Sequence, residues 1–241
     1  SARSVEVVKQ YIATNKGILK DLAKESTQAN RAAAASLIEV AIQRACSDIY
    51  RLATTDSTKR GMGTTFVCLV ITGSKGLIGH VGDSRVYLVR NGQCHRLTED
   101  HTLIAAQLKA GTITKEQALS SQYRNVITRA VGIQESVQVD TLIVDCLPGD
   151  LFLLCSDGLH GYIADEEVTT LAASTPNLKE MPDRLVAFAN ERGGKDNITA
   201  VVVGCTADPS TSTEEVAEAQ SRMEALKKIP LFRHLTYKEQ T

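Results

Sequence analysis

Short runs of β-branched and aliphatic residues follow one another from residue 64 onward, and tight turns join several of them. Asn91-Gly92 separates two such runs and suits the two positive-φ positions of a hairpin turn. Pro148-Gly149-Asp150 is a turn between two others. Because the runs do not alternate regularly with helices, the pattern predicts antiparallel sheets with helices on their outer faces. The expected strands are 64–71, 76–81, 85–90, 93–97, 137–146, 150–156 and 197–204.

The rest of the chain has helical periodicity. Residues 1–54 are predicted to be helical, because apolar residues between Ala34 and Ile49 recur at the three-and-four spacing of one buried face. After Gly204 the composition becomes small and polar, which predicts a linker over 206–215 and a short helix over about 214–228. Further helices are expected near 99–110, 114–121, 165–174 and 178–192.

Composition excludes several classes of protein. Lys plus Arg (27) and Asp plus Glu (28) nearly cancel, so no general attraction to nucleic acid or to anionic lipid is expected. No run approaches the roughly 18 apolar residues of a membrane span, and no secretion leader is recognisable. The six cysteines form no Cys-x-x-Cys pair. Cysteines that remain in the reduced state are typical of cytoplasmic proteins, so a cytoplasmic location is expected.

Two aspartates at predicted strand ends are the main candidates for chemistry. Asp157 follows the apolar run LFLLC, and Asp196 follows Gly193-Gly194 just before the run NITAVVVG. Carboxylates that converge at strand ends suit magnesium or manganese, which prefer oxygen ligands. Asp-Gly and Asp-Asn are also common in ordinary turns. Either motif alone therefore leaves a purely structural role open.

Several longer patterns occur in a fixed order and, taken together, resemble the metal-dependent type-2C serine/threonine protein phosphatases of bacteria. The resemblance covers nearly all of residues 1–204. The matching patterns are GMGTT (61–65), HVGDSRVYL (80–88), LTEDHT (97–102), NVITRAVG (125–132), LPGDLFLLCSDGL (147–159) and GGKDNITAVVV (193–203).

The resemblance implies a fold and a reaction. The fold is α+β, a four-layer α-β-β-α sandwich of two antiparallel sheets flanked by helices, formed by a catalytic domain over 1–204. The reaction is dephosphorylation of phosphoserine and phosphothreonine proteins by a metal-activated water, with two core Mg²⁺ or Mn²⁺ ions. Asp157 and Asp196 match aspartates on those core metals. Asp100 matches a ligand of an additional, weaker metal, or alternatively caps the helix that follows it.

The sequence departs from the family in two places. The family's first strands, a phosphate-binding arginine, an acidic ligand and an Asp-Gly-x-Gly-Gly loop have no counterpart here and are expected to lie before Ser1. The chain alone is therefore expected to lack N-terminal strands, to hold half of the core metal shell, and to be inactive. Gly161 stands where relatives usually have an aspartate for the accessory metal, so the third site is expected to be weakened.

Other residues of these patterns are expected to be structural. The stretch 82–85 is interpreted as a hydrogen-bonded turn, His80 as a packed or hydrogen-bonded side chain, and Arg129 as half of an ion pair. Residues 103–124 correspond to the family's variable flap, which is expected to tune the choice of substrate.

Partners follow from the same resemblance. Substrates are expected to be phosphoproteins targeted by a serine/threonine kinase, with no nucleic acid and no membrane involved. Residues 226–240 resemble the start of a cyclic-nucleotide-binding domain, or form a simple helical extension. Two rival functions remain open: an inactive relative that binds phosphoproteins as a scaffold, and a hydrolase of small phosphorylated metabolites.

Overall fold

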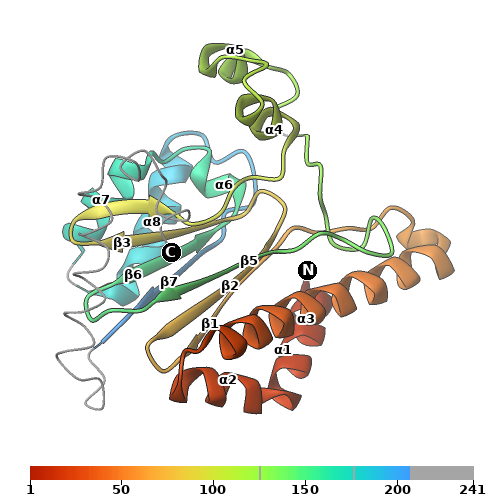
Figure 1. Cartoon of the computed structure of the whole chain (residues 1–241). Coiled ribbons are helices and arrows are strands. Elements are labelled where there is room, and N and C mark those ends of the chain that lie inside the picture. Colours follow the sequence, from red (N-terminus) through yellow and green to blue (C-terminus); the bar gives the residue numbers. More distant parts are fainter. Residues whose placement is uncertain (125, 176, 207–241) are drawn as a thin grey trace. The chain divides into compact units, whose positions relative to one another are not determined.

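A computed structural model describes residues 1–124, 126–175 and 177–206 of the chain (Figure 1). It divides into two compact units. The first contains residues 1–72, 77–84 and 99–142, and the second contains 73–76, 85–98 and 143 onward. The predicted helix over 214–228 and the resemblance over 226–240 lie outside the described residues. The predicted domain boundary near residue 204 stays a prediction.

Three helices open the first unit. They are α1 (Ala2–Thr14), α2 (Lys16–Lys24) and α3 (Gln28–Thr55), followed by the 3-10 turn η1 (Ser57–Lys59). The predicted helical region is confirmed, with breaks at Asn15 and over 25–27. Thr27 starts α3 because its side chain accepts the backbone N–H of Asn30. The apolar face of α3 is buried as expected, and α1 and α2 pack on this helix.

A three-stranded sheet contains β1 (Phe66–Thr72), β2 (Lys75–Val81) and β5 (Asp140–Asp145) in the order β1-β2-β5. Helix α3 lies against β2, where a Cβ atom at Gly79 would stand 2.4 Å from Ile38 Cγ2. β5 begins later than the predicted 137, because the backbone N–H of Val137 bonds to the side chain of Gln43.

The flap region of the first unit is helical. It contains α4 (Leu103–Lys109) and α5 (Lys115–Ser120), which confirms the two helices expected near 99–110 and 114–121. Each starts at a threonine. Thr102 accepts the N–H of Ala105, and Thr114 forms a capping box with Gln117.

A four-stranded antiparallel sheet organises the second unit, in the order β4-β3-β6-β7. Its strands are β3 (Arg85–Arg90), β4 (Gln93–Arg96), β6 (Leu151–Cys155) and β7 (Ala200–Gly204). Asn91 and Gly92 join β3 to β4 with φ values of 52° and 71°, so the predicted hairpin turn is confirmed. Leu153 of β6 pairs with both Tyr87 of β3 and Val202 of β7, which places it at the centre of the sheet.

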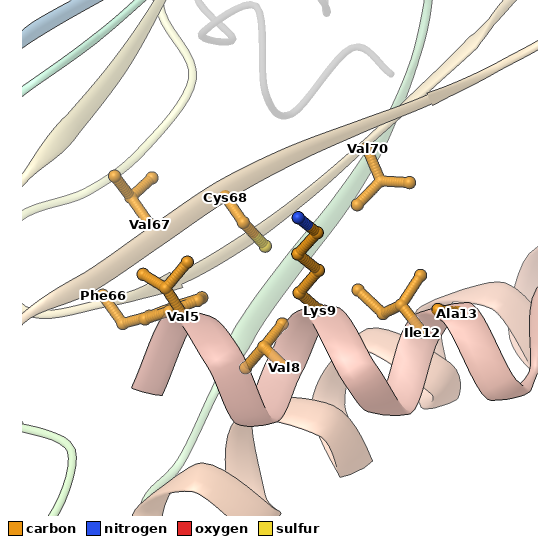
Figure 2. A pocket seen from close by; sticks show the side chains of 9 residues that line it. All are labelled: Val5, Val8, Lys9, Ile12, Ala13, Phe66, Val67, Cys68 and Val70. Atoms are coloured by element: carbon orange, nitrogen blue, oxygen red, sulfur yellow. The ribbon is translucent and has the colours of Figure 1, made fainter. Parts of the chain in front are cut away.

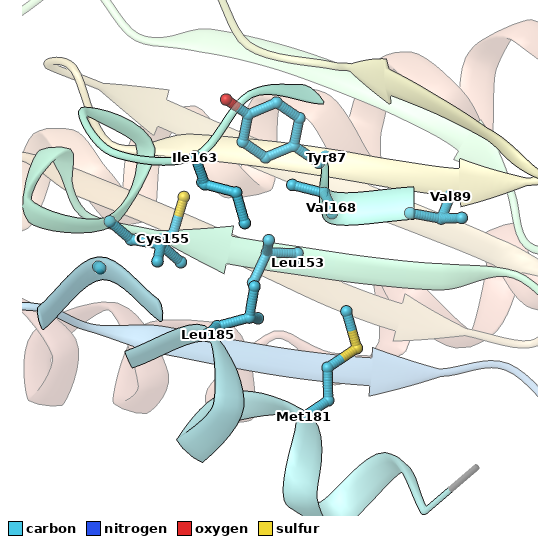
Figure 3. Close-up of a cluster of buried hydrophobic side chains, with 10 residues drawn as sticks. Tyr87, Val89, Leu153, Cys155, Ile163, Val168, Met181 and Leu185 are labelled. Carbon is cyan, nitrogen blue, oxygen red and sulfur yellow. The ribbon is translucent and has the colours of Figure 1, made fainter. Parts of the chain in front are cut away.

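Helices cover one face of this sheet. They are α6 (Asp157–His160), α7 (Asp165–Ala173) and α8 (Met181–Glu191), with the 3-10 turn η2 (Leu178–Glu180) before α8. The short α6 was not predicted. Figure 3 shows the buried cluster between helices and strands, in which Leu185 and Met181 of α8 meet Leu153 of β6. Tyr87 and Leu153 are fully buried there.

The expected α+β class is confirmed, because two antiparallel sheets each carry packed helices. In the part of the chain that the structure describes, no helix combines the length and the apolar character needed to cross a bilayer.

Candidate metal centre

Asp157 and Asp196 lie at the same end of two neighbouring strands. β6 ends at Cys155 and β7 begins at Ala200, and these two residues pair with each other in the antiparallel ladder. The chain that leaves β6 and the chain that enters β7 therefore meet at one edge of the sheet. Both aspartates are exposed to solvent there. The prediction that these two carboxylates share a strand edge agrees with this placement.

Hydrogen bonds of Ser156 join the two turns that carry the aspartates. The N–H of Ser156 donates to the carbonyl of Thr199 (3.1 Å), and Ser156 Oγ accepts the N–H of Thr199 (3.0 Å). Ser156 Oγ also donates to the carbonyl of Asn197 (3.1 Å). The Ser156 hydroxyl takes the place of a backbone acceptor for the Thr199 N–H, which is why β7 begins at residue 200 and not at the predicted 197. These hydrogen bonds also hold the two turns together.

Each carboxylate is oriented by the residue that follows it. Asp157 Oδ1 accepts the N–H of Gly158 at 2.9 Å, and Asp196 Oδ1 accepts the N–H of Asn197 at 2.6 Å. A carboxylate has two oxygens and several lone pairs, so these bonds leave acceptor capacity for a cation. Both side chains are thus positioned without being neutralised.

Tyr162 supports the turn before Asp196. Its hydroxyl accepts the backbone N–H of Lys195 at 3.3 Å, and its ring lies beside Gly193. Arg192 donates to the Tyr162 carbonyl (2.8 Å) and forms an ion pair with Glu167 (2.6 Å), a contact that lowers the pKa of Glu167. Tyr162 follows α6, the short helix that begins at Asp157. Through its hydroxyl it therefore connects this helix to the turn that carries Asp196. No local pattern in the sequence indicates this role.

The two aspartates fit a hard divalent cation in their chemistry. They offer exposed carboxylate oxygens, which Mg²⁺ and Mn²⁺ prefer. Within the described ranges, no cluster of three or more His, Cys, Asp or Glu side chains is arranged to hold a metal. The pair is therefore a partial ligand set, which water or further residues would complete.

Asp100 belongs to the first unit and is half-buried. The suggestion that it caps the following helix is wrong, because Thr102 is the N-cap of α4 and accepts the N–H of Ala105 at 3.2 Å. Its role as a metal ligand stays a prediction. Gly161 ends α6 and donates its N–H to the carbonyl of Asp157 at 2.9 Å. It has no side chain with which to bind a third metal.

Arg129, interpreted as half of an ion pair, pairs with Asp140 at 3.0 Å. The sequence did not single out His101, which lies beside this pair. Its Nδ1 accepts the N–H of Gly82 at 3.1 Å, and its Nε2 lies 3.2 Å from Arg129 Nη1 and 3.5 Å from Asp140 Oδ2. His80 is buried and its ring centroid lies 4.6 Å from that of His101, which confirms it as a packed side chain.

A groove of about 370 Å³ lies in the first unit, between α1 and β1 (Figure 2). Apart from Lys9, its lining is apolar and contains no carboxylate. Such a lining does not suit a metal-bound phosphate, so the groove is not part of the candidate metal centre. Its lining residues are Val5, Val8, Lys9, Ile12, Ala13, Phe66, Val67, Cys68 and Val70.

Comparison with known proteins finds similar phosphatases. The serine/threonine phosphatase stp of Listeria innocua serovar 6a is 38% identical over 166 residues, which make up 69% of this chain and 66% of that protein. The chain therefore spans just under two thirds of this relative. The solved S. agalactiae serine/threonine phosphatase is 35% identical, with a TM-score of 0.67 over 70% of each chain. The catalytic domain of the phosphatase PstP, solved with 2 manganese ions, is 29% identical, with a TM-score of 0.62 over 84% of this chain and 82% of that one.

The family described as protein phosphatase 2C matches residues 2–202. The match includes the turns of Asp157 and Asp196 and both sheets, apart from the last two residues of β7. It extends over far more than half of the described residues. The chain belongs to the protein phosphatase 2C family.

Proposed function

We propose that this protein is a metal-dependent serine/threonine phosphatase that hydrolyses phosphoserine and phosphothreonine in proteins. The observation that carries the proposal is the juxtaposition of Asp157 and Asp196 at one end of β6 and β7, fixed by the bonds of Ser156 to Thr199 and Asn197. The similar proteins support it, because they are named as serine/threonine phosphatases.

Asp157 and Asp196 would hold Mg²⁺ or Mn²⁺ through their carboxylate oxygens. The PstP domain solved with 2 manganese ions supports this choice of metal. When bound, such ions lower the pKa of a water molecule and offset the negative charge of the phosphoryl group. Asp100 would help to hold an accessory ion, and the absence of a side chain at Gly161 would make that ion bind weakly.

The chain's own residues would keep the carboxylates at a fixed separation. Gly158 and Asn197 N–H groups orient one oxygen of each aspartate, and Tyr162 holds the turn before Asp196. Two carboxylates supply fewer than the six oxygen ligands of an octahedral Mg²⁺ site. Water or further acidic side chains would therefore complete the coordination of each ion.

Substrate choice would depend on residues 103–124. Leu119 at the end of α5 is 79% exposed and Tyr123 is 53% exposed. Exposed apolar side chains beside polar helices can contact a phosphorylated peptide without taking part in chemistry. The flap would therefore select among phosphoproteins, which we propose to be targets of a serine/threonine kinase.

A cytoplasmic location fits the cysteine chemistry. All six cysteines, among them Cys46 and Cys155, are free thiols, as is usual for proteins of a reducing compartment. A cyclic-nucleotide sensor after residue 226 would make the phosphatase responsive to a small ligand. This part of the proposal rests on the sequence resemblance alone.

The test is phosphatase activity of the full-length protein toward a phosphothreonine peptide, with Mn²⁺ and with EDTA. Asp157→Asn and Asp196→Asn keep the side-chain shape and should each lower kcat/KM by about 100-fold. Asp21→Asn, which removes an exposed carboxylate from α2, is the matched control and should stay active.

Two outcomes would favour the rival functions. Absence of Mn²⁺-dependent turnover by the folded full-length protein, together with retained binding of the phosphopeptide, would support a scaffold. Faster turnover of small phosphorylated metabolites than of phosphopeptides would support a metabolite hydrolase.

A further inference from the structure

Cys146 and Cys205 lie on two segments that are joined by backbone hydrogen bonds. Cys205 follows β7 and continues its pairing with the start of β6: its N–H donates to the carbonyl of Asp150 (2.8 Å), and its carbonyl accepts the N–H of Gly149 (2.9 Å). Cys146 begins the turn that ends at Asp150. The turn over 146–150 therefore contains Cys146 and forms backbone hydrogen bonds with Cys205.

A buried ion pair holds this turn. Arg90 Nε donates to Asp150 Oδ1 at 2.7 Å, and Arg90 Nη2 donates to the carbonyl of Asp145 at 2.7 Å. Asp150 Oδ2 accepts the N–H of Leu147 at 2.7 Å. Arg90 and Asp150 are 8% and 3% exposed. These groups fix the backbone on both sides of Cys146, and with it the turn that pairs with Cys205.

The two thiols interact directly and differ in acidity. A hydrogen bond between the two thiols raises the pKa of Cys146 and lowers that of Cys205. Burial raises the pKa of Cys146 further. Cys205 is half-buried and Cys146 is buried. Cys205 is thus the more accessible and the more acidic of the two thiols, which is the pattern of an attacking thiolate beside a resolving thiol.

Three of the other cysteines, Cys46, Cys68 and Cys94, lack these properties. Burial raises the pKa of Cys46, of Cys68 to about 11, and of Cys94 to about 12. A thiol with a raised pKa is mostly protonated at neutral pH and reacts slowly with oxidants. Cys94 is half-buried like Cys205, so it is a matched reference for accessibility without a neighbouring thiol donor.

We propose that Cys146 and Cys205 are an oxidation site, at which a hydroperoxide converts the two thiols into one reversible disulfide bond. The Cys205 thiolate attacks a peroxide oxygen, the O–O bond breaks, and the departing oxygen takes a proton to leave as water or alcohol. Cys146 then attacks the resulting sulfenic sulfur. The S–S bond forms, the S–O bond breaks, and the hydroxyl leaves as water with the proton from Cys146. A low-molecular-weight thiol reverses the change by exchange.

The disulfide would enclose both candidate metal ligands in one covalent loop. Residues 147–204 lie between the two cysteines and include Asp157 and Asp196. The bond itself forms at the end of the sheet where Leu151 pairs with Gly204, and the aspartates lie at the opposite end, beyond Cys155 and Ala200. Oxidation is therefore expected to raise the unfolding temperature by restricting the unfolded chain, without blocking the metal site.

The test is oxidation of the purified protein by hydrogen peroxide, followed by alkylation of the remaining thiols and mass spectrometry of its peptides. The expected result is a cross-linked pair of Cys146 and Cys205 peptides that is lost after reduction. The unfolding temperature of the oxidised protein should be higher. Recovery of both cysteines in alkylated form, while other cysteines are oxidised, would overturn the proposal.

Variants separate the roles of the two thiols. Cys146→Ser should leave a sulfenic acid at Cys205 that a dimedone probe traps, and Cys205→Ser should lose both the cross-link and this labelling. Cys94→Ser should form the cross-link at the wild-type rate. Equal dimedone labelling of Cys94 and Cys205 in the wild-type chain would contradict the assigned order of attack. The wild-type peptide map needs no variant, so a variant that fails to fold does not affect it.

Discussion

A Cβ atom placed on Gly158 would lie 2.4 Å from the backbone carbonyl oxygen of Asn197. Real Cβ atoms do not approach backbone oxygens so closely, so the turn that follows Asp157 has room only for hydrogen at this position. Asn197 directly follows Asp196. The contact between Gly158 and Asn197 therefore sets how closely the two candidate metal ligands approach each other.

Replacement of Gly158 by alanine should push the two turns apart. Because the obstructing atom belongs to the backbone, the clash cannot be relieved by a side-chain rotation, and we expect a loss of about 1–3 kcal/mol of unfolding free energy. Urea unfolding measures this loss. The control is Gly17→Ala in α2, where a Cβ meets nothing within 4 Å and the helix should gain up to about 1 kcal/mol. Equal stability of the Gly158 variant and wild type would refute the steric argument.

Tyr162→Phe removes the hydroxyl that accepts the Lys195 N–H and keeps the ring beside Gly193. Loss of one such bond should reduce the unfolding free energy by about 0.5–1.5 kcal/mol. The turn that carries Asp196 should also become less ordered, so the affinity of the full-length protein for Mn²⁺ should fall. Tyr123→Phe, at an exposed flap residue, should change neither quantity. Unchanged Mn²⁺ affinity in the Tyr162 variant would show that this hydroxyl does not position Asp196.

Asp150→Ala should be among the most destabilising substitutions in the second unit. It leaves the buried guanidinium of Arg90 without its carboxylate, and removes the acceptor of the Leu147 N–H. Breaking a buried ion pair from one side costs about 3–5 kcal/mol. Lys109→Ala breaks the exposed pair with Glu99 and should cost at most about 1 kcal/mol. Chemical unfolding measures the loss of unfolding free energy in each variant. Similar losses would contradict the argument that burial makes the Arg90–Asp150 pair the more costly one to break.

Asp56 should make stability depend on pH in the acidic range. Its side chain pairs with Lys59 and accepts bonds from Thr58, and these contacts lower its pKa from 3.8 to about 2. Since the folded-state pKa is the lower one, the contribution is complete above about pH 4 and is lost as the pH falls through about 2. The difference in unfolding temperature between wild type and Asp56→Asn should shrink over this interval. A constant difference would contradict the ion-pair account.

Local patterns allowed much of the fold to be predicted. The spacing of apolar residues from Ala34 to Ile49 predicted the buried face of α3, and Asn91-Gly92 predicted the turn between β3 and β4, because both depend only on residues close in sequence. The positions of Asp157 after one strand and of Asp196 before another were also predicted. That they lie on adjacent strands follows from the pairing of Cys155 with Ala200, which no local pattern specifies.

Features that depend on distant residues were missed. The Tyr162 hydroxyl bonds to Lys195, and His101 bonds to Gly82, so neither role has a signature within a short window. The start of β7 could not be separated from its turn, because the side chain of Ser156 replaces strand pairing at Thr199. The capping role suggested for Asp100 failed because Thr102, two residues later, offers a hydroxyl at the helix start.

Asp157 and Asp196 are proposed to hold a divalent metal together. The most direct measurement is Mn²⁺ binding to the full-length protein, followed by electron paramagnetic resonance, for wild type, Asp157→Asn, Asp196→Asn, the double variant and Asp21→Asn. We predict a loss of affinity of at least about 10-fold in each single variant. The double variant should lose little more, because the two residues serve one centre, and Asp21→Asn should bind as wild type does. Wild-type stoichiometry and affinity in both single variants would contradict the proposal that these two aspartates are metal ligands.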